Sequence, residues 1–483
     1  MAYLGIDLGT SGLRALLVDA DGVPIGATER PYSVSLPHPG WSEQDPADWI
    51  DAFEGAVEAL RTTYPQFADL KGIGVAGQMH GATLLDETDA VLRPCILWND
   101  MRSHEEAARL DRMPRVRDLS GNIVFPGFTA PKLEWARVNE PEIFSRVAKV
   151  LLPAAYLNLY LTGEHVADMS DSAGTSWLDV GARGWSDVLL EAGNMRGDQM
   201  PRLVEGTDRA GDLRAGLLRK WGLTGPVAVA GGAGDNAAAA CGIGALDEGQ
   251  GFVSLGTSGV LLAARGGFSP APDTALHTFC HAIPGRWYQM GVMLSATDSL
   301  NWLARIAATE PAHLTSGLGE MPAAPGKERF LPYLSGERTP HNDAEIRGSF
   351  TGLSTGTTRE DLTRAVLQGV GFGLRDSFEV LKSTGTELGN LIAIGGGTRS
   401  RYWVRLIATI LGVPLRLPSG GEFGAALGAA RLGMTAHTGA AADRIMGEPK
   451  ISEEYAPVAD LRAAYDDAYA AFRAAYPGIR AAQ

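Results

Sequence analysis

A five-residue segment, LGTSG, occurs twice in this chain of 483 residues, as Leu8 to Gly12 and as Leu255 to Gly259. Each copy follows a short apolar run and precedes another, which predicts a strand, a tight glycine turn and a second strand. The two copies lie about half the chain apart, so they predict two similar domains that each open with this hairpin. We place the boundary between residues 244 and 245, which gives domains 1–244 and 245–483.

A third glycine turn lies in "LIAIGGGTRS", Leu391 to Ser400, where it follows an apolar run. The segment after it has apolar residues at helical spacing and ends at Gly412, so it predicts a helix. A second helix is expected over residues 362–381, although its three inner glycines weaken it unless close packing requires them. One amphipathic helix is expected after Glu453. Strands and helices alternate throughout, which favours an α/β fold.

Composition excludes several classes of partner. The net charge of −14 at pH 7 argues against a surface for nucleic acid or for an anionic membrane. The first residues, MAYLGIDLGT, have a strand-like pattern rather than that of a signal peptide, and no apolar run is long enough to span a bilayer. Cys95, Cys241 and Cys280 are widely spaced, which fits a reducing compartment, so we expect a cytoplasmic protein. The oligomeric state is left open, a homodimer included.

The two LGTSG turns have the chemistry of phosphate-binding loops. Backbone N–H groups and the hydroxyls of Thr10 and Ser11 suit phosphate oxygens. Asp7, just before the first turn, suits Mg²⁺, which takes few carboxylates together with phosphate oxygens and water. In the second copy Ser254 replaces this acid, so only the first hairpin predicts a metal. Two ordinary β-turns are the alternative.

The third turn contains Gly396 and Gly397 and is a weaker signal. Placed after two turns of the phosphate type, it could pack against a nucleotide base or ribose. The alternative is an ordinary turn from strand to helix.

Two further segments carry groups that suit a sugar. In "GVAGQMHGATLLD", Met79 and His80 follow a buried strand, and a histidine there can bond a hydroxyl-rich ligand, or it can be a satisfied core histidine. In "ILWNDMRS", Trp98 lies beside amide and charged groups, as in a sugar-binding wall. The alternative is that Asn99 or Asp100 caps the next helix.

The segment "HTFCH" contains His277, Cys280 and His281. A tetrahedral zinc site needs a fourth ligand, and strand alternation places the cysteine on the face opposite the two histidines. We therefore expect no zinc site in this segment.

A lone carboxylate, Asp235, lies among glycines and alanines in "GGAGDNAAAACGIG". It could cap an alanine-rich helix, or it could be a general base at a helix N-terminus that faces a cleft between the domains. Residue chemistry alone leaves these two interpretations nearly equal. A helix N-terminus favours the ionised form, so we expect this aspartate to be charged at pH 7 and able to accept a hydroxyl proton during phosphoryl transfer.

Taken together, these segments resemble the FGGY carbohydrate kinases, within the superfamily of actin, sugar kinases and chaperone ATPases. The resemblance covers nearly the full length to about Gly433. The motifs that carry it are GIDLGTSG, WSEQDP, AGQMHGATLLD, LRPCILWND, PGFTAPKLEW, DMSDSAGTSWLDV, GDNAA, SLGTSGV, LPYLSGERTPHN, GSFTGL and GGGTRSRYW. It implies two actin-like (ribonuclease H-like) domains, each a mixed sheet flanked by helices, that enclose a deep cleft.

The resemblance also implies roles for single residues. Asp235 matches the catalytic base, which takes the proton from the terminal hydroxyl of the sugar, and Asp7 matches the acid that works with Mg²⁺. Met79 and His80 match the pair that contacts the substrate, and Asn236 is expected near the sugar.

On the nucleotide side, Gly256 and Thr257 match the second phosphate loop, and Gly397 matches the third turn. Many members carry an asparagine beside the adenine where this chain has Arg401, so we assign no base recognition to that residue.

Within the family, "GQMHGATLLD" and "WSEQDP" point to members that use ATP and Mg²⁺ to convert D-xylulose to D-xylulose 5-phosphate. A kinase for ribulose, ribitol or an arabinitol-type pentitol is the alternative. A non-catalytic actin-like ATPase is a further alternative, but such a protein would have no reason to keep "GQMHGAT" together with Asp235.

Overall fold

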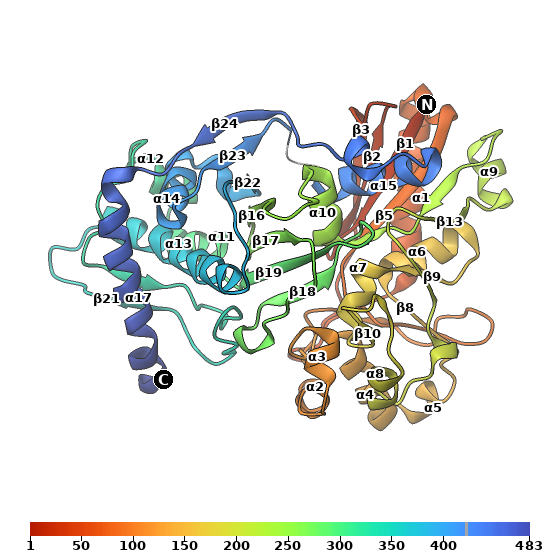
Figure 1. Ribbon diagram of the computed structural model, residues 1–483, viewed down its shortest axis with the longest axis horizontal. Helices are drawn as coiled ribbons and strands as arrows, with labels where there is room; N and C mark the ends of the chain where they lie inside the picture. Colours follow the sequence, from red (N-terminus) through yellow and green to blue (C-terminus); the bar gives the residue numbers. More distant parts are fainter. Residues whose placement is uncertain (421–423) are drawn as a thin grey trace.

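In the part of the chain that the structure describes, two seven-stranded sheets organise the fold, one in each half (Figure 1). The computed structural model describes residues 1–420 and 424–483. The first sheet contains β1 (Ala2–Leu8), β2 (Gly12–Val18), β3 (Pro24–Pro31), β5 (Leu70–Gly77), β13 (Arg209–Asp212), β14 (Ala228–Ala230) and β15 (Ala233–Gly234). The second contains β16 (Gly251–Leu255), β17 (Gly259–Arg265), β18 (His277–Cys280), β19 (Trp287–Met293), β22 (Leu391–Ile394), β23 (Leu415–Pro418) and β24 (Ile451–Tyr455).

The repeated hairpin is present in both sheets, as the sequence predicts. β1 pairs with β2, and β16 with β17, in both cases antiparallel across the LGTSG turn. The hairpin is then extended by parallel strands, β5 and β14 in the first sheet and β22 and β23 in the second. The predicted α/β fold with two mixed sheets flanked by helices is therefore confirmed.

The helices cover both sheets and fill the lobes beside them. In the first half they are α1 (Pro46–Thr63), α2 (His104–Asp111), α3 (Val116–Ser120), α4 (Thr129–Asn139), α5 (Pro141–Phe144), α6 (Pro153–Thr162), α7 (Met169–Ser172), α8 (Asp187–Ala192), α9 (Ala215–Trp221) and α10 (Asp235–Ile243). In the second half they are α11 (Thr297–Ile306), α12 (Pro311–Ser316), α13 (Arg359–Ser383), α14 (Arg401–Leu411), α15 (Gly424–Thr438), α16 (Ala442–Ile445) and α17 (Arg462–Ala482). Five short strand pairs complete the fold: β4 (Glu43–Gln44) with β7 (Cys95–Ile96), β6 (Thr83–Leu85) with β8 (Lys149–Leu151), β9 (Val166–Asp168) with β12 (Arg202–Val204), β10 (Leu178–Asp179) with β11 (Gly184–Trp185), and β20 (Arg329–Leu331) with β21 (Ser349–Thr351).

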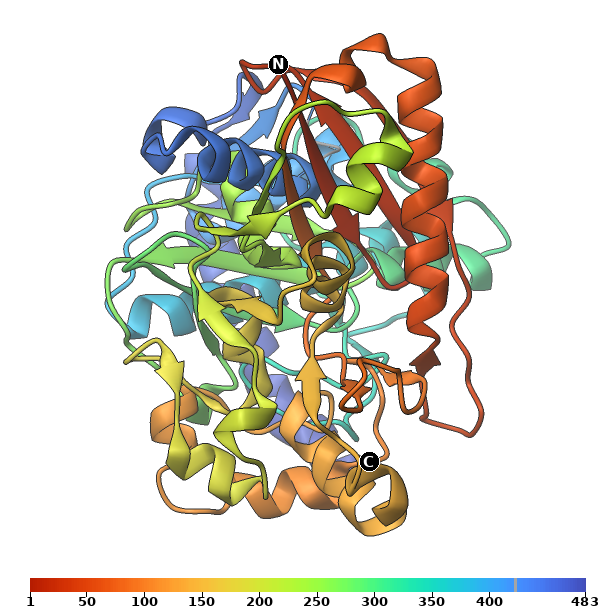
Figure 2. The same ribbon diagram turned by 90° about the vertical axis from the view of Figure 1, so that its right-hand side faces the viewer.

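Strand alternation decides which way Asp7 points. Leu4, Ile6 and Leu8 of β1 belong to the core that contains α1 and α6, whereas Tyr3 packs with α15. Figure 2 shows that α1 and α15 lie on opposite faces of the first sheet. Residues of odd number on β1 therefore face α15. Asp7 and Gly424, the first residue of α15, line the same cavity.

Helices α10 and α15 pack across the two halves. α15 lies on β1 and β5 of the first sheet, while α10 shares a core with Phe252 of β16 and Ile392 of β22. The two helices are in close contact, since a Cβ atom on Gly428 would lie 1.8 Å from the carbonyl oxygen of Ala238. The proposed boundary at residues 244/245 falls between α10 and β16, and it stays a prediction because these helices link the halves on both sides of it.

The predicted helices of the second half are present, with one correction. α13 tolerates its inner glycines because they sit against other elements: a Cβ atom on Gly369 would lie 2.2 Å from the carbonyl oxygen of Phe330. The predicted helix before Gly412 is α14. The segment after Glu453 is not one helix from its start, because β24 extends to Tyr455 and α17 begins only at Arg462.

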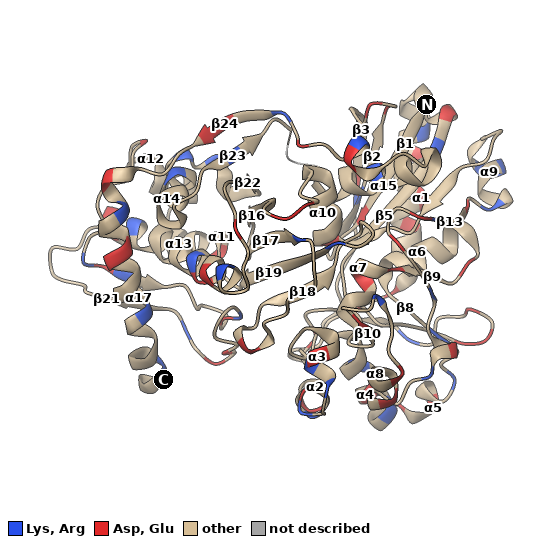
Figure 3. Cartoon of the chain, in the orientation of Figure 1, with Lys and Arg blue, Asp and Glu red and all other residues tan. Residues whose placement is uncertain are grey.

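Charged residues of both signs occur in both halves of the structure (Figure 3). Within the part of the chain that the structure describes, none of the helices has the length and apolar character needed to cross a membrane.

Candidate active site

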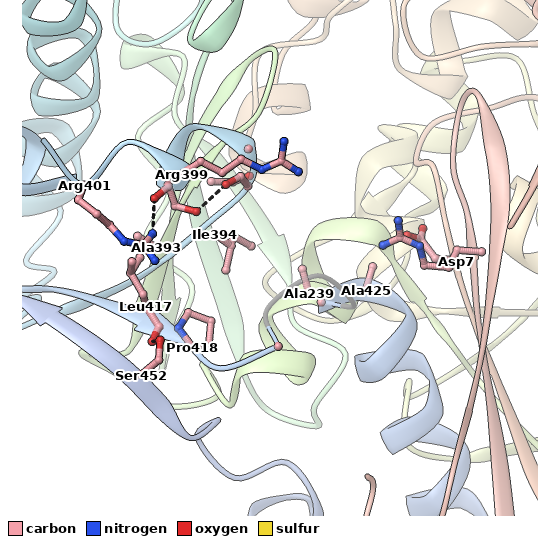
Figure 4. Close-up of a pocket in the computed structure, with 17 residues that line it drawn as sticks. Asp7, Ala239, Ala393, Ile394, Arg399, Arg401, Leu417, Pro418, Ala425 and Ser452 are labelled. Atoms are coloured by element: carbon pink, nitrogen blue, oxygen red, sulfur yellow. Dashed lines mark hydrogen bonds between the residues drawn. The ribbon is translucent and has the colours of Figure 1, made fainter. Parts of the chain in front are cut away.

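The carboxyl ends of the parallel strands of both sheets meet at a cavity of about 670 Å³ between the two halves. This is the edge at which open α/β sheets bind ligands. Figure 4 shows Asp7 on one wall and Arg399 and Arg401 on the other. The cavity is lined by Asp7, Arg14 and Ala239 from the first half and by Ser254, Gly395, Gly396, Thr398, Arg399, Arg401, Gly424 and Ala425, among others, from the second.

Asp7 is the acid of the first wall. It is half-buried, and it pairs in register with Arg14 on the neighbouring strand. Burial, and next the carboxylate of Asp235, raise the pKa of Asp7 to about 6, while Arg14 lowers it. The two acids are therefore close enough for their charges to interact, although they lie far apart in the sequence.

Asp235 is the first residue of α10, with Gly234 at the capping position. Its Oδ1 accepts hydrogen bonds from the backbone N–H of Asn236 at 2.7 Å and from the side-chain amide of Asn236 at 2.8 Å. Burial nevertheless raises the pKa of Asp235 to about 6, and the two bonds from Asn236 only partly oppose this. A carboxyl of that pKa is still roughly 90% ionised at pH 7, so the carboxylate can accept a proton.

Met79 and His80 lie in the loop that follows β5. Met79 is buried and its sulfur accepts a hydrogen bond from the hydroxyl of Tyr288 at 3.8 Å. His80 has a left-handed backbone with φ 71°, which costs about 1–2 kcal/mol for a residue other than glycine. Its Nδ1 donates to the carbonyl oxygen of Gly174 at 2.7 Å.

The protonation of His80 follows from these contacts. Burial lowers the pKa of His80 to about 3, so the ring is neutral at pH 7. Because a carbonyl can only accept, the single ring proton is on Nδ1, and Nε2 is left as a hydrogen-bond acceptor. Such a nitrogen suits the hydroxyl of a sugar.

Trp98 is 42% exposed and is connected to the first glycine turn. Its indole N–H donates to the hydroxyl of Thr10 at 2.9 Å, and that hydroxyl donates to Oε1 of Gln78 at 3.0 Å. Nε2 of Gln44 donates to the backbone carbonyl of Thr10 at 2.6 Å. The hydroxyl of Thr10 therefore links the first glycine turn to Trp98 through a hydrogen bond. The side chain of Ser11, the next residue of the turn, is exposed.

Asn99 and Asp100 do not cap the next helix. α2 begins at His104 with Ser103 at the capping position, so this alternative is wrong. Asp100 is instead buried, where it accepts from the backbone N–H of Ser42 at 2.6 Å and forms an ion pair with Arg102 at 2.7 Å. The buried acid thus holds the loop of Trp98 against the loop before β4.

The second and third glycine turns form the opposite wall. Thr257 is exposed, and the carbonyl of Gly256 accepts from the backbone N–H and the hydroxyl of Thr297 at 2.9 and 2.8 Å. Beside these turns lies a second cavity of about 620 Å³. It is lined by Gly256, Thr257, Thr297, Leu300, Asn301, Glu310, Thr315, Gly396, Gly397, Arg399, Ser400 and Trp403, among others.

The third turn separates the two cavities, because Gly396 and Arg399 line both. Arg401 is held on the wall of the first cavity by an ion pair with Glu453 at 2.5 Å and by donation to the carbonyl of Thr398 at 2.6 Å.

The histidines of β18 and its end bond to protein groups. His277 lies 3.2 Å from Oδ1 of Asn122, and His281 lies 3.1 Å from the carbonyl of Ala245. Among residues 1–420 and 424–483 the structure has no group of three or more His, Cys, Asp or Glu that could hold a metal ion.

Three buried charged residues near the site escape sequence reasoning. Asp168 caps the N-terminus of α7 and Asp171 lies within that helix. Burial, and then the charges of Asp168 and Asp235, hold the pKa of Asp171 well above its ordinary value. Lys132 donates to the carbonyl of His80 at 2.7 Å. Their motifs, "DMSDSAGTSWLDV" and "PGFTAPKLEW", were visible, but no spacing rule connects them with residues 50 or more positions away.

Family models match both halves of the chain. The N-terminal domain of the FGGY family of carbohydrate kinases matches residues 2–242, and the C-terminal domain matches residues 251–437. The chain belongs to the FGGY family of carbohydrate kinases. It is 45% identical to the xylulose kinase of Escherichia coli strain K12 over 98% of both chains, and 49% identical to that of Klebsiella pneumoniae over 89% of both.

The solved structure of a xyloylose kinase from Brucella ovis is 57% identical and covers 100% of both chains with a TM-score of 0.98. The chain is thus a sugar kinase of this family, with a sugar and ATP as its substrates. The family membership and the two-domain architecture that the sequence motifs predicted are confirmed.

Proposed function

We propose that this FGGY kinase transfers the γ-phosphoryl group of ATP to the terminal hydroxyl of D-xylulose, which gives ADP and D-xylulose 5-phosphate. The observation that carries the proposal is the position of Asp235, a largely ionised carboxylate at the N-terminus of α10, electrostatically coupled to Asp7. The choice of D-xylulose as the sugar is supported by the similarity to the xylulose kinases of Escherichia coli and Klebsiella pneumoniae, which covers 98% and 89% of this chain.

In the proposed mechanism Asp235 is the general base. Its carboxylate takes the proton from the terminal hydroxyl as the oxygen forms a bond to the γ-phosphorus, and the bond from that phosphorus to the bridging oxygen breaks to release ADP. Proton transfer of this kind contributes about 10²- to 10⁴-fold, and the rest of the acceleration comes from positioning and charge neutralisation. Asn236, which bonds to Oδ1 of Asp235, orients the carboxylate and lies beside the sugar.

Asp7 has the properties of a ligand for Mg²⁺ bound to the nucleotide. It is a half-buried carboxylate whose ionised form is disfavoured by burial and by the charge of Asp235, and a divalent cation would relieve both effects. Mg²⁺, when bound, would neutralise phosphate charge and orient the transferred group.

The sugar and the nucleotide are assigned to different groups of residues in the site. We assign Met79, His80 and Trp98 to the sugar, with Nε2 of His80 accepting from a sugar hydroxyl. The phosphates and the nucleoside are assigned to Gly256, Thr257, Gly396 and Gly397, which line the cavities. Thr10 and Ser11 of the first turn are assigned to the phosphates on the LGTSG motif. Domains 1–244 and 245–483 would close over both substrates, which excludes water from the reaction.

The experiment is an ADP-release assay with a panel of ketoses and polyols at fixed Mg-ATP. We expect D-xylulose to give the highest kcat/KM. A higher value for ribulose, ribitol or an arabinitol would replace the proposed sugar with that substrate and would leave the kinase chemistry intact.

A further inference from the structure

The N-terminus of α4 forms a cradle around His80, the residue that we assign to the sugar. The ring of His80 stacks on Phe128 with centroids 4.5 Å apart and planes 18° from parallel. The carbonyl of His80 accepts from the hydroxyl of Thr129 at 3.1 Å and from Nζ of Lys132 at 2.7 Å. Thr129 and Lys132 are three residues apart on α4, so they share a face of the helix, and that face meets the His80 peptide.

This carbonyl belongs to the one residue of the loop whose backbone is strained. With φ 71°, the His80 peptide is held in a conformation that a histidine rarely adopts. Such conformations persist only where the surroundings over-determine them. Two donors on the carbonyl, a stacked ring and the bond from Nδ1 to Gly174 supply that constraint.

Lys132 is an unexpected donor for this purpose. It is 1% exposed, and burying an ammonium group is costly, so a structural role alone would be served by a neutral side chain. Burial lowers the pKa of Lys132 to about 7. Cys95 and Asp100 oppose this shift, and Arg102 adds to it. Its charge also helps to lower the pKa of His80, which keeps that ring neutral and Nε2 an acceptor.

We propose that Lys132 is a positioning residue for the sugar: its ammonium group fixes the His80 carbonyl and thereby aims Nε2 of His80 at a hydroxyl of the substrate. This inference rests on the proposed assignment of His80 to the sugar. It extends the site to a residue that touches neither substrate and that acts through another side chain.

A double-mutant cycle tests the proposal. The variants are Lys132→Met, which keeps the length of the side chain and removes the donor, His80→Ala, and both together. In the wild-type background we expect Lys132→Met to raise the KM for the sugar about tenfold, with the KM for ATP unchanged. In the His80→Ala background the same substitution should change the sugar KM less than twofold, because its effect passes through His80. An equal increase in both backgrounds would overturn the proposal.

Thr129→Val keeps the test decisive if Lys132→Met does not fold. This variant removes the other donor to the same carbonyl with little change in volume, and we expect a smaller increase in sugar KM that is also lost in the His80→Ala background. If neither substitution changes the sugar KM while thermal unfolding shows a folded protein, Lys132 is structural only and the proposal fails. The cycle uses whichever sugar the wild-type enzyme phosphorylates best, so a wrong choice of D-xylulose would show in the substrate panel and not in the cycle.

Discussion

Replacement of Asp235 by asparagine tests the central assignment with a minimal change of shape. The amide oxygen can still accept from the backbone N–H of Asn236, but the negative charge and the proton acceptor are lost. Loss of a general base costs about 10²- to 10⁴-fold in kcat. That corresponds to roughly 3–5.5 kcal/mol in the activation barrier. The KM for the sugar should stay within a few fold, because the sugar contacts that we assign to Met79 and His80 are untouched.

The pH dependence of kcat/KM gives a second, independent test of Asp235. With a pKa of about 6, Asp235 would be roughly 90% ionised at pH 7 and about 10% at pH 5, so wild-type kcat/KM should fall on the acid side with a midpoint near pH 6. Asp7 also has a pKa of about 6, and the charge of Asp235 contributes to it. The acid limb of the pH profile therefore reports the titration of both carboxyls, and its slope should exceed one. In Asp235→Asn the residual activity should show a single-slope limb at lower pH, since Asp7 loses its charged neighbour.

The assay is coupled ADP release from pH 5 to 8, with Asp376→Asn as a matched control. Asp376 is also buried, its pKa is raised to about 6 by burial, and it accepts from the hydroxyl of Tyr469 at 2.6 Å between α13 and α17, outside the two cavities. We expect the folded fraction of this control to keep wild-type kcat. A kcat for Asp235→Asn within tenfold of wild type, or an equal loss in both variants, would refute the role of Asp235 as base.

Three other predictions concern the metal, the packing and the buried acids. Asp7→Asn should raise the Mg²⁺ concentration for half-maximal rate about tenfold or more, and an identical Mg²⁺ titration would count against the assignment. Gly428→Ala should destabilise by about 1–3 kcal/mol in chemical unfolding, because its Cβ meets Ala238, whereas Gly216→Ala on α9 meets nothing within 4 Å and should be neutral or stabilising. The raised pKa of Asp171 means that the folded state binds its proton more tightly than the unfolded state, so this group's contribution to stability is lost as pH rises above about 4 through the folded pKa. Asp171→Asn should therefore lose less unfolding free energy than wild type between pH 5 and 8, and parallel pH curves would contradict this.

The sequence predicted those parts of the fold that repeat or alternate. The LGTSG repeat gave both hairpins, and apolar spacing gave α13 and α14. The packing of α10 and α15 was not predictable, because an alanine- and glycine-rich helix has no pattern that selects its partner. The structure shows that the two helices meet, for example where Gly428 fits closely against Ala238.

In the site, too, the sequence predicted residues in local motifs but not contacts between residues far apart in the chain. Asp7 and the glycine turns were candidates because they lie where a strand meets a turn. Asp235 was a candidate because it is a lone carboxylate among glycines and alanines, and the resemblance to the FGGY kinases favoured its role as a base. The sequence also suggested that Asp235 is charged at pH 7, and a pKa of about 6 agrees with this. The sequence did not show the burial that raises this pKa above its ordinary value. Trp98 bonds to Thr10 and Lys132 bonds to His80, and these pairs are 88 and 52 residues apart. No local periodicity encodes such bonds, so sequence reasoning cannot find them.

The two halves share a scaffold, and the acids make them different. In both sheets a central strand, β1 or β16, ends at a glycine turn and is flanked by a parallel strand. At the equivalent position β1 carries Asp7 opposite Arg14, whereas β16 carries Ser254 opposite Val260. Asp235 follows a parallel strand of the first half only. A pair of interacting carboxylates therefore belongs to one wall, and the other wall offers hydroxyls, glycine backbone and the guanidinium groups of Arg399 and Arg401. Since the acceptor hydroxyl must give up a proton and the nucleotide brings its own negative charge, the acidic wall suits the sugar and the cation, and the wall with the arginines suits the nucleotide.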